Sequence, residues 1–288
     1  MESNEVAPNQ ATTIRCGRKE LRLGERTLIM GILNVTPDSF SDGGKYVRVE
    51  QAVEQAQRMV EEGADIIDIG GESTRPGFQQ VSAEEELRRV IPVIEAISSK
   101  LDVPISVDTY KAETAKQSLE AGAHIINDIW GFKRDPHMAE VAAAYGCPVI
   151  LMHNRETEDY VDFLQDVKSD LAESIKIAKR AGVKDEQIIL DPGIGFAKSH
   201  EQNLHLMNHL YALGEMGYPV LLATSRKRMI RNVLELPVDD VVEGTLATTV
   251  IGIMQGCSII RVHDVKANRR AADMTDAIQR RKKVPFHG

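Results

Sequence analysis

The feature that most constrains this chain is a regular alternation of short β-branched segments with longer segments of helical periodicity, which starts near Thr27. Such alternation predicts parallel strands joined by crossover helices. Eight strands are expected, at residues 28–33, 65–69, 105–107, 124–126, 149–152, 187–190, 220–223 and 258–262. Apolar residues at helical spacing follow each strand, including single helices expected over 201–215 and 264–280. Eight consecutive units without a linker favour an α/β fold of the single (β/α)8 TIM barrel type over the alternative, an open sheet in two halves.

The length of the chain agrees with one barrel, because such barrels typically use about 250 residues as a single domain. Of the 288 residues, 42% are hydrophobic, which is enough for one sizeable core. Residues 1–13 are polar and show no periodicity, so they are predicted to form a flexible N-terminal tail. Residues 14–288 are predicted to form the barrel domain.

Composition excludes several classes of protein. The formal net charge is −8 and the basic residues are dispersed, so no nucleic acid partner is expected. Cys16, Cys147 and Cys257 are far apart and lack CxxC spacing, which argues against disulfides and structural zinc. No stretch approaches the roughly 20 apolar residues that span a membrane, and the first residues lack a signal-peptide pattern, so a cytoplasmic protein is expected.

A barrel of this type places its catalytic residues at the carboxyl ends of the strands. All eight predicted ends carry polar groups: Asn34, Gly70-Gly71-Glu72, Asp108, Asn127-Asp128, Met152-His153, Asp191, Thr224-Ser225-Arg226-Lys227, and Arg261 with His263. Loops are polar by default, which accounts for a single residue of this kind better than for the whole set. Asp108, Asp191 and the amide of Asn127 form an acceptor-rich surface suited to an amidine-like edge, such as that of a 2-amino-4-oxo-pteridine.

Cationic side chains occupy other positions of the predicted mouth. They are Arg75, Lys227, Arg261 and His263. Arginine matches the geometry of phosphate oxygens, so this half of the mouth indicates a site for a polyanion. The alternative for Arg261 and His263 is ion pairing with Glu72 or Asp264. Two loops, Val35–Arg48 and Glu72–Val81, exceed the usual roughly 2–6 residues of such connections and are predicted to close over the substrate.

These residues carry a resemblance to a known family. Met30–Gly44 and Asp68–Gly77 resemble the two signatures of the dihydropteroate synthases. The resemblance continues through Ser106–Thr109, Ile126–Asp128, Asp191–Phe196, Ser225–Lys227 and Arg261–Asp264. It implies a cytoplasmic homodimer, a target of sulfonamides, that condenses 7,8-dihydropterin-6-ylmethyl pyrophosphate with para-aminobenzoate to give 7,8-dihydropteroate and pyrophosphate with the help of Mg²⁺.

The resemblance also implies roles for individual residues. Those matching the pterin site are Asp108, Asn127, Met152, Asp191, Gly195, Phe196 and Lys227. Those matching the pyrophosphate contacts are Asn34, Thr74, Arg261 and His263, with Asn34 also the Mg²⁺ ligand. Those matching the para-aminobenzoate pocket are Phe40, Pro76, Phe196 and Lys227. The implied catalytic set is Asp42, Arg75 and Lys227, and Arg228 stands where many relatives have serine.

The implied mechanism begins with loss of pyrophosphate, which leaves a cation that the aromatic amine attacks. Mg²⁺, Arg261 and His263 would stabilise the leaving group, and Asp42 would favour the cation. Three alternatives are a pterin-binding methyltransferase, a catalytically silent pterin-binding paralogue, and a Schiff-base aldolase that uses Lys227. A metallohydrolase fits less well, because the first strand ends in Asn-Val-Thr rather than His-x-His.

Overall fold

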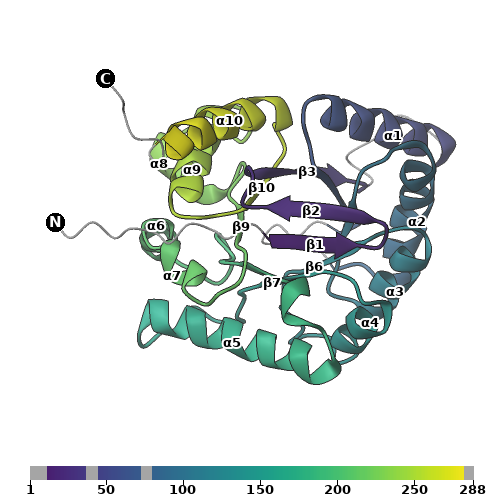
Figure 1. Ribbon diagram of the computed structural model, residues 1–288, viewed down its shortest axis with the longest axis horizontal. Coiled ribbons are helices and arrows are strands. Elements are labelled where there is room, and N and C mark those ends of the chain that lie inside the picture. Colours follow the sequence, from purple (N-terminus) through teal and green to yellow (C-terminus); the bar gives the residue numbers. More distant parts are fainter. Residues whose placement is uncertain (1–11, 37–44, 73–79, 282–288) are drawn as a thin grey trace.

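The computed structural model describes residues 12–36, 45–72 and 80–281, and within them eight parallel strands are surrounded by helices (Figure 1). The strands are β3 (Leu28–Asn34), β4 (Ile66–Gly70), β5 (Ile105–Asp108), β6 (Ile125–Asp128), β7 (Val149–Met152), β8 (Ile188–Asp191), β9 (Leu221–Ala223) and β10 (Ile259–Val262). Every predicted strand is present; four end one residue further toward the carboxyl end than expected, β6 ends two residues further, and three end as expected.

The sheet has the order β8-β7-β6-β5-β4-β3-β10-β9. A parallel bridge pairs Leu190 of β8 with Val220, the residue directly before β9. The two strands at the ends of this order are therefore neighbours in space. The amide of Leu190 also donates to the carbonyl of Pro219 at 2.9 Å. The sheet therefore curls round on itself, which confirms the predicted (β/α)8 barrel and excludes the open two-part sheet.

The helices surround this sheet. They are α1 (Lys45–Glu61), α2 (Ala83–Lys100), α3 (Ala112–Glu120), α4 (Met138–Tyr145), α5 (Phe163–Ala181), α6 (His200–Met207), α7 (Tyr211–Gly214), α8 (Arg228–Leu234), α9 (Val242–Met254) and α10 (Val265–Arg281), with a short 3-10 turn at Asp185–Gln187. The single helix predicted over 201–215 is wrong, because α6 ends at Met207 and the chain turns before α7. No helix within the described ranges is long and apolar enough to cross a membrane.

Two apolar layers hold the barrel together. The larger lies between the sheet and the helices and includes Ile67, Ile94 and Leu171. The smaller fills the barrel interior with side chains from alternate strand positions, among them Met30 and Ile125. Because the strands are covered on both faces, β-branched and leucine side chains dominate them, as parallel sheets require.

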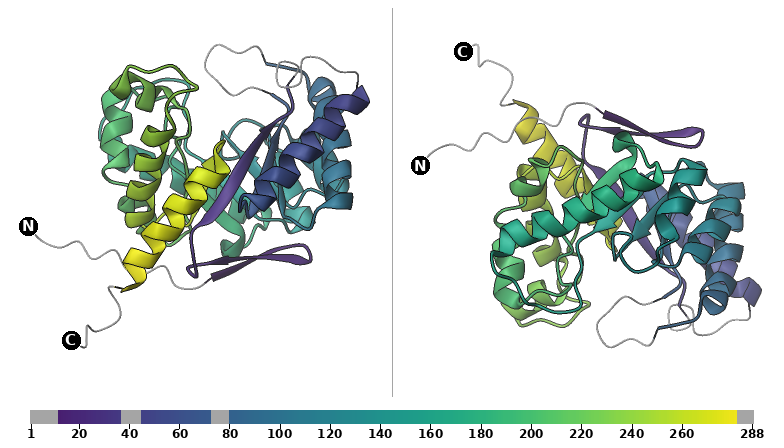
Figure 2. Two further views of the ribbon diagram at one scale, coloured as in Figure 1. Left: turned by 90° about the horizontal axis from the view of Figure 1, so that it is seen from above. Right: turned by 90° about the horizontal axis from the view of Figure 1, so that it is seen from below.

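An antiparallel hairpin precedes the barrel and was not predicted. It consists of β1 (Thr12–Cys16) and β2 (Lys19–Leu23). The predicted tail boundary is therefore too late, since β1 begins at Thr12. Ile14, Cys16, Leu21 and Leu23 point to one side and join the interior cluster with residues near the strand starts, such as Leu28 and Ile66. The hairpin covers the end of the barrel that receives the amino ends of the strands (Figures 1 and 2).

Candidate active site

A partly buried arginine joins two carboxylates at the mouth of the barrel. Arg261, on β10, donates from Nε to Asp68 Oδ2 and from a terminal nitrogen to Asp108 Oδ2, both at 2.6 Å. Asp68 lies on β4 and Asp108 ends β5, so the guanidinium reaches across the barrel interior. Burial raises the pKa of Asp108 to about 7, and the positive charge of Arg261 opposes this effect.

Two oxygens of this cluster have no hydrogen-bond partner among the described residues. They are Asp68 Oδ1 and Asp108 Oδ1, and both are buried. The amide nitrogen of Asn127, which is also buried, contacts the other oxygen of Asp68 at 3.4 Å. Buried acceptors without donors are costly, so this surface favours a ligand that presents N–H groups.

The segment after β8 forms the opposite wall, and we call residues 192–197 the pocket loop. Asp191 Oδ1 accepts the amide of Gly193 at 2.7 Å, and burial raises the pKa of Asp191. Lys227 donates to the carbonyl of Ile194 at 2.5 Å, and its nitrogen lies 4.8 Å from the centre of the Phe196 ring. Burial lowers the pKa of Lys227 to about 8, although Asp191 opposes this shift. The loop thus brings an acid, a base and an aromatic face together.

Gly195 is required at its place in this loop. Its φ of 84° lies in the left-handed region, which side-chain-bearing residues rarely adopt. A Cβ atom at this position would also lie 3.2 Å from Cδ of Lys227. The glycine therefore allows the lysine stem to pack directly against the loop backbone.

Asn34 and Met152 complete the described parts of the mouth. A Cβ atom on Gly70 would lie 3.7 Å from Asn34 Oδ1 and 3.8 Å from Asp108 Oδ2, so these two side chains face each other across the glycine. Met152 is buried at the end of β7. The structure thus brings Asn34 near the carboxylate end of the site.

His263 is held at the end of β10 by a serine. Its backbone amide donates to Ser225 Oγ at 3.2 Å, and Ser225 Oγ lies 3.0 Å from Nδ1 of the ring. These two contacts to one hydroxyl fix the orientation of the His263 ring at the end of β10.

The carboxylates named as alternative partners for Arg261 bind other cations. Asp264 pairs with Arg226 at 2.8 Å. Glu72 pairs with Lys111 at 2.5 Å and accepts the hydroxyl of Tyr110 at 2.9 Å.

Several predicted site residues lie outside the described residues. They are Phe40, Asp42, Thr74, Arg75 and Pro76. Arg228, next to Lys227, is exposed at the start of α8.

Sequence reasoning assigned no role to three buried polar residues at or beside this site. Asp68 is fully buried and binds Arg261, although the sequence analysis treated it only as part of a motif. A carboxylate inside an otherwise apolar strand was the signal that pointed to it. Lys198 and His153 contact each other behind the pocket loop at 2.7 Å. No periodicity indicates that pair, because its members come from different βα units.

Comparison with known proteins shows to which family this chain belongs. The model of the pterin binding enzyme family matches residues 30–263, so the chain is a pterin-binding enzyme built on this barrel. It is 60% identical to a dihydropteroate synthase of Clostridium beijerinckii, over 93% of this chain and all of the relative. It is 58% identical to a dihydropteroate synthase of Bacillus subtilis, over 94% of this chain and 95% of the relative. The chain therefore belongs to the dihydropteroate synthase family, and it is a transferase.

Solved structures of that family have the same fold. The dihydropteroate synthase of Clostridium difficile, crystallised in the presence of pteroic acid, shares 52% identity with a TM-score of 0.88, over 90% of this chain and 98% of that one. The enzyme of Xanthomonas albilineans, in complex with 7,8-dihydropteroate, shares 41% identity with a TM-score of 0.86, over 95% and 100%.

Proposed function

We propose that this chain condenses 7,8-dihydropterin-6-ylmethyl pyrophosphate with para-aminobenzoate to give 7,8-dihydropteroate and pyrophosphate. The observation that carries the proposal is the pair of buried, unpartnered carboxylate oxygens on Asp68 and Asp108. A 2-amino-4-oxo-pteridine presents adjacent N–H donors that match such acceptors. The ligands of the related structures, pteroic acid and 7,8-dihydropteroate, contain this ring.

The pterin ring would lie between the carboxylate cluster and the pocket loop. Asp108, Asn127 and Asp191 would accept or exchange hydrogen bonds with the ring edge, and Lys227 would donate to its oxygen or nitrogen acceptors. Met152, Gly195 and Phe196 would form the walls. Asp68 joins this set on the geometry described above, since it shares the guanidinium of Arg261 with Asp108.

The pyrophosphate would bind on the cationic side of the mouth. The ring of His263 and the N–H groups of Arg261 that do not contact Asp68 or Asp108 would contact its oxygens, together with Asn34 and Thr74. Para-aminobenzoate would lie further out, against Phe196 and Lys227, with Phe40 and Pro76 beside it. The related enzyme of Yersinia pestis has been solved with a sulfonamide drug, and we expect sulfonamides to bind this chain at the same outer position.

A magnesium ion fits this arrangement. Among the described residues no group of three His, Cys, Asp or Glu side chains is placed to hold a metal. Mg²⁺ commonly uses few protein ligands and completes its shell with water and substrate phosphates. Asn34 would hold the ion, which when bound would supply positive charge at the leaving pyrophosphate.

The residues favour departure of pyrophosphate before attack by the amine. Asp42 would stabilise positive charge that develops on the pterin, and Arg75 and Lys227 would orient the amine substrate. No covalent enzyme intermediate is needed.

The deciding experiment incubates the purified chain with the pterin pyrophosphate, Mg²⁺ and para-aminobenzoate, and measures pyrophosphate and dihydropteroate together. Equal amounts of both products support the proposal. Binding of pterin without either product would instead identify a catalytically silent paralogue.

We further propose that the chain works in the cytoplasm as a homodimer. Exposed apolar side chains gather on three neighbouring helices, α8, α9 and α10. They include Val233, Ile251, Met254, Met274 and Ile278, each 44–63% exposed. A patch of this kind on a globular protein commonly marks a protein interface.

A further inference from the structure

A buried lysine stands directly behind the pocket loop. The side chain of Lys198 is only 6% exposed, yet its ammonium group makes three hydrogen bonds. It donates to the carbonyls of Gly193 at 2.9 Å and Phe196 at 3.0 Å, and to Nδ1 of His153 at 2.7 Å. Burial lowers the pKa of Lys198 to about 7, but its three acceptors favour the charged form, because only an ammonium group has three donors. Two of these donors serve the backbone of the loop.

His153 is fixed as the acceptor for this lysine. Its ring is fully buried, and burial lowers the pKa of His153 to about 4, so the ring is neutral. With Nδ1 accepting from Lys198, the proton resides on Nε2 and is donated to Asp170 at 2.9 Å. Asp170 also accepts from Nε of Arg155 at 2.5 Å. A continuous line of side chains therefore runs from Arg155 to the pocket loop.

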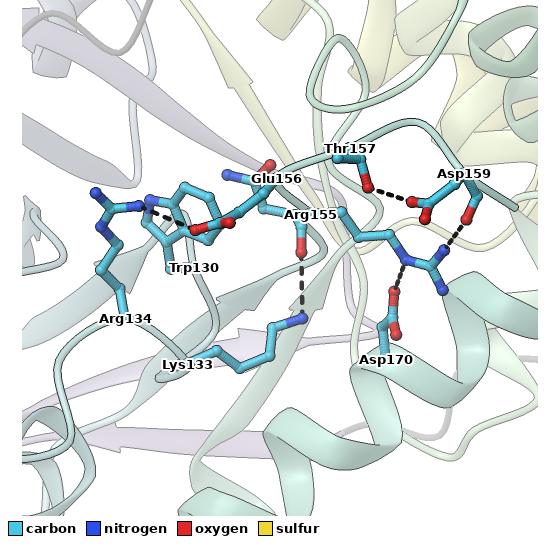
Figure 3. A pocket seen from close by; sticks show the side chains of 9 residues that line it. Trp130, Lys133, Arg134, Arg155, Glu156, Thr157, Asp159 and Asp170 are labelled. Carbon is cyan, nitrogen blue, oxygen red and sulfur yellow. Dashed lines mark hydrogen bonds and ion pairs between the residues drawn. The ribbon is translucent and has the colours of Figure 1, made fainter.

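The outer end of this line is open to solvent. Figure 3 shows Arg155 directed at Asp170 on α5, beside a cavity of about 630 Å³ between the segments that follow β6 and β7. None of the residues assigned above to the substrates lines this cavity. The line thus connects the surface to the rear of the pterin pocket without belonging to the pocket itself.

The pocket loop needs such support because its backbone adopts the left-handed region at three positions, one of which carries a side chain. Gly193, Gly195 and Ala197 have φ values of 67°, 84° and 44°. Glycine adopts this region readily, whereas at Ala197 the side chain makes it unfavourable. A Cβ on Gly193 would lie 2.0 Å from the carbonyl oxygen of His153, so the loop also passes very close to the end of β7.

We propose that Lys198, oriented by His153, is a positioning residue that holds the pocket loop in the shape the pterin site requires. The inference rests on the proposed function, since it assigns the loop to the pterin pocket. Through Gly193 it acts on Asp191, which accepts the Gly193 amide, and through Phe196 it fixes the ring over which Lys227 lies. Lys198 touches no substrate in this arrangement.

The test titrates pteroic acid into wild type and Lys198→Met by calorimetry. Methionine keeps the length of the buried stem and removes all three donors. We expect the dissociation constant to rise about 10- to 100-fold, as for the loss of hydrogen bonds from a charged group. In steady-state assays the KM for the pterin substrate should rise by a similar factor. A purely structural role would lower the active fraction, and hence kcat, at unchanged KM. Wild-type affinity in a folded Lys198→Met would overturn the proposal.

Arg269→Met is the matched control. Arg269 is also a buried cation, but it donates to the carbonyl of Thr27 at the opposite end of the barrel. The Arg269→Met variant should have a lower melting temperature than wild type and a pteroic acid affinity within twofold of wild type. If Arg269→Met weakens pteroic acid binding as much as Lys198→Met does, the effect is general and the proposal is overturned.

His153→Leu independently tests the contact between His153 and Lys198. It also tests the proposal if Lys198→Met does not fold. It should weaken pteroic acid binding by a smaller factor, and the double variant should bind no more weakly than Lys198→Met alone. Unchanged affinity in His153→Leu, or strictly additive losses, would overturn the coupling. Failure of the wild type to bind pteroic acid would count against the proposed function itself.

Discussion

Asp108 combines burial, a negative charge and an unpartnered oxygen, and its chemistry follows from the competition among them. Burial disfavours the carboxylate, whereas the guanidinium of Arg261 at 2.6 Å favours it. Replacement by asparagine keeps the shape and removes the charge. We expect Asp108→Asn to bind pteroic acid about 10- to 100-fold more weakly, which corresponds to about 1.5–3 kcal/mol for a hydrogen bond to a charged group. Calorimetry measures the affinity, with the exposed Asp273→Asn as the control. Equal affinities of wild type and Asp108→Asn would show that Asp108 does not contact the pterin.

The raised pKa of Asp108 also predicts a pH dependence. The pKa rises from the ordinary 3.8 to about 7, so the folded protein keeps a proton between about pH 4 and pH 7 that the unfolded chain releases. This group therefore lowers the free energy of unfolding as pH rises through that window. Pterin binding needs the ionised acceptor, so affinity for pteroic acid should increase as the pH rises from 5 through 7, and should level off only once the pH is well above the pKa of about 7. A series of titrations should show a flatter profile in Asp108→Asn; identical profiles would assign the titration to another group.

Asp42 allows a test of the order of chemical steps. If pyrophosphate leaves before the amine attacks, wild type with the pterin pyrophosphate and Mg²⁺ should release some pyrophosphate without any amine. Asp42→Asn removes the charge that would stabilise the cation and should slow both this release and full turnover at least tenfold. No amine-free release above the enzyme-free background, or normal turnover of Asp42→Asn, would favour direct displacement.

Among the elements, the hairpin β1–β2 shows what periodicity alone overlooks. Ile14, Cys16, Leu21 and Leu23 do alternate with exposed residues, as a half-buried strand pair should. The two runs have only five residues each and precede the βα pattern, so the sequence analysis did not recognise them as strands. Their partner surface, the amino ends of the barrel strands, exists only once the barrel has formed.

The barrel elements themselves were predictable because each strand and most helices carry a predominantly apolar pattern. The break between α6 and α7 was not, since apolar residues such as Leu206, Leu210 and Leu213 remain buried on both sides of the turn. The strand-end rule placed Asp108 and Asp191 at the mouth, where both lie. Contacts across the barrel, such as that of Arg261 with Asp68, depend on the length and direction of the side chains, and the spacing of residues in the sequence does not indicate them.

The hairpin should contribute stability without contributing to the site. Leu21 is 2% exposed and packs into the interior cluster, so Leu21→Ala should lower the free energy of unfolding by about 2–5 kcal/mol. Urea denaturation measures this loss. The exposed Arg22→Ala on the same strand should change stability by less than about 0.5 kcal/mol. Pteroic acid affinity should remain that of wild type in both; a marked loss in Leu21→Ala would show that the two ends of the barrel are coupled.

At the scale of the whole molecule, the apolar patch on α8, α9 and α10 predicts self-association. Met274 is 63% exposed there, and a charge at its position should oppose burial of the patch. We expect wild type to sediment as a dimer and Met274→Glu to shift toward the monomer at the same micromolar concentration. Val161→Glu is the control, because Val161 is a fully exposed apolar residue outside the patch. Equal sedimentation of wild type and Met274→Glu would place any dimer interface elsewhere.

The hairpin at the base of the barrel determines the route by which substrates enter the site and products leave it. With Ile14, Cys16, Leu21 and Leu23 packed into the strand starts, the barrel is blind-ended, and reactants and products share the mouth. On the proposed function, a pterin bound at Asp108 and Asp191 would lie at the closed end of the site, with the amine substrate between it and the solvent. We therefore expect ordered binding, in which the pterin enters first. Any compound that binds at the outer position should then slow the dissociation of the ligand at the closed end.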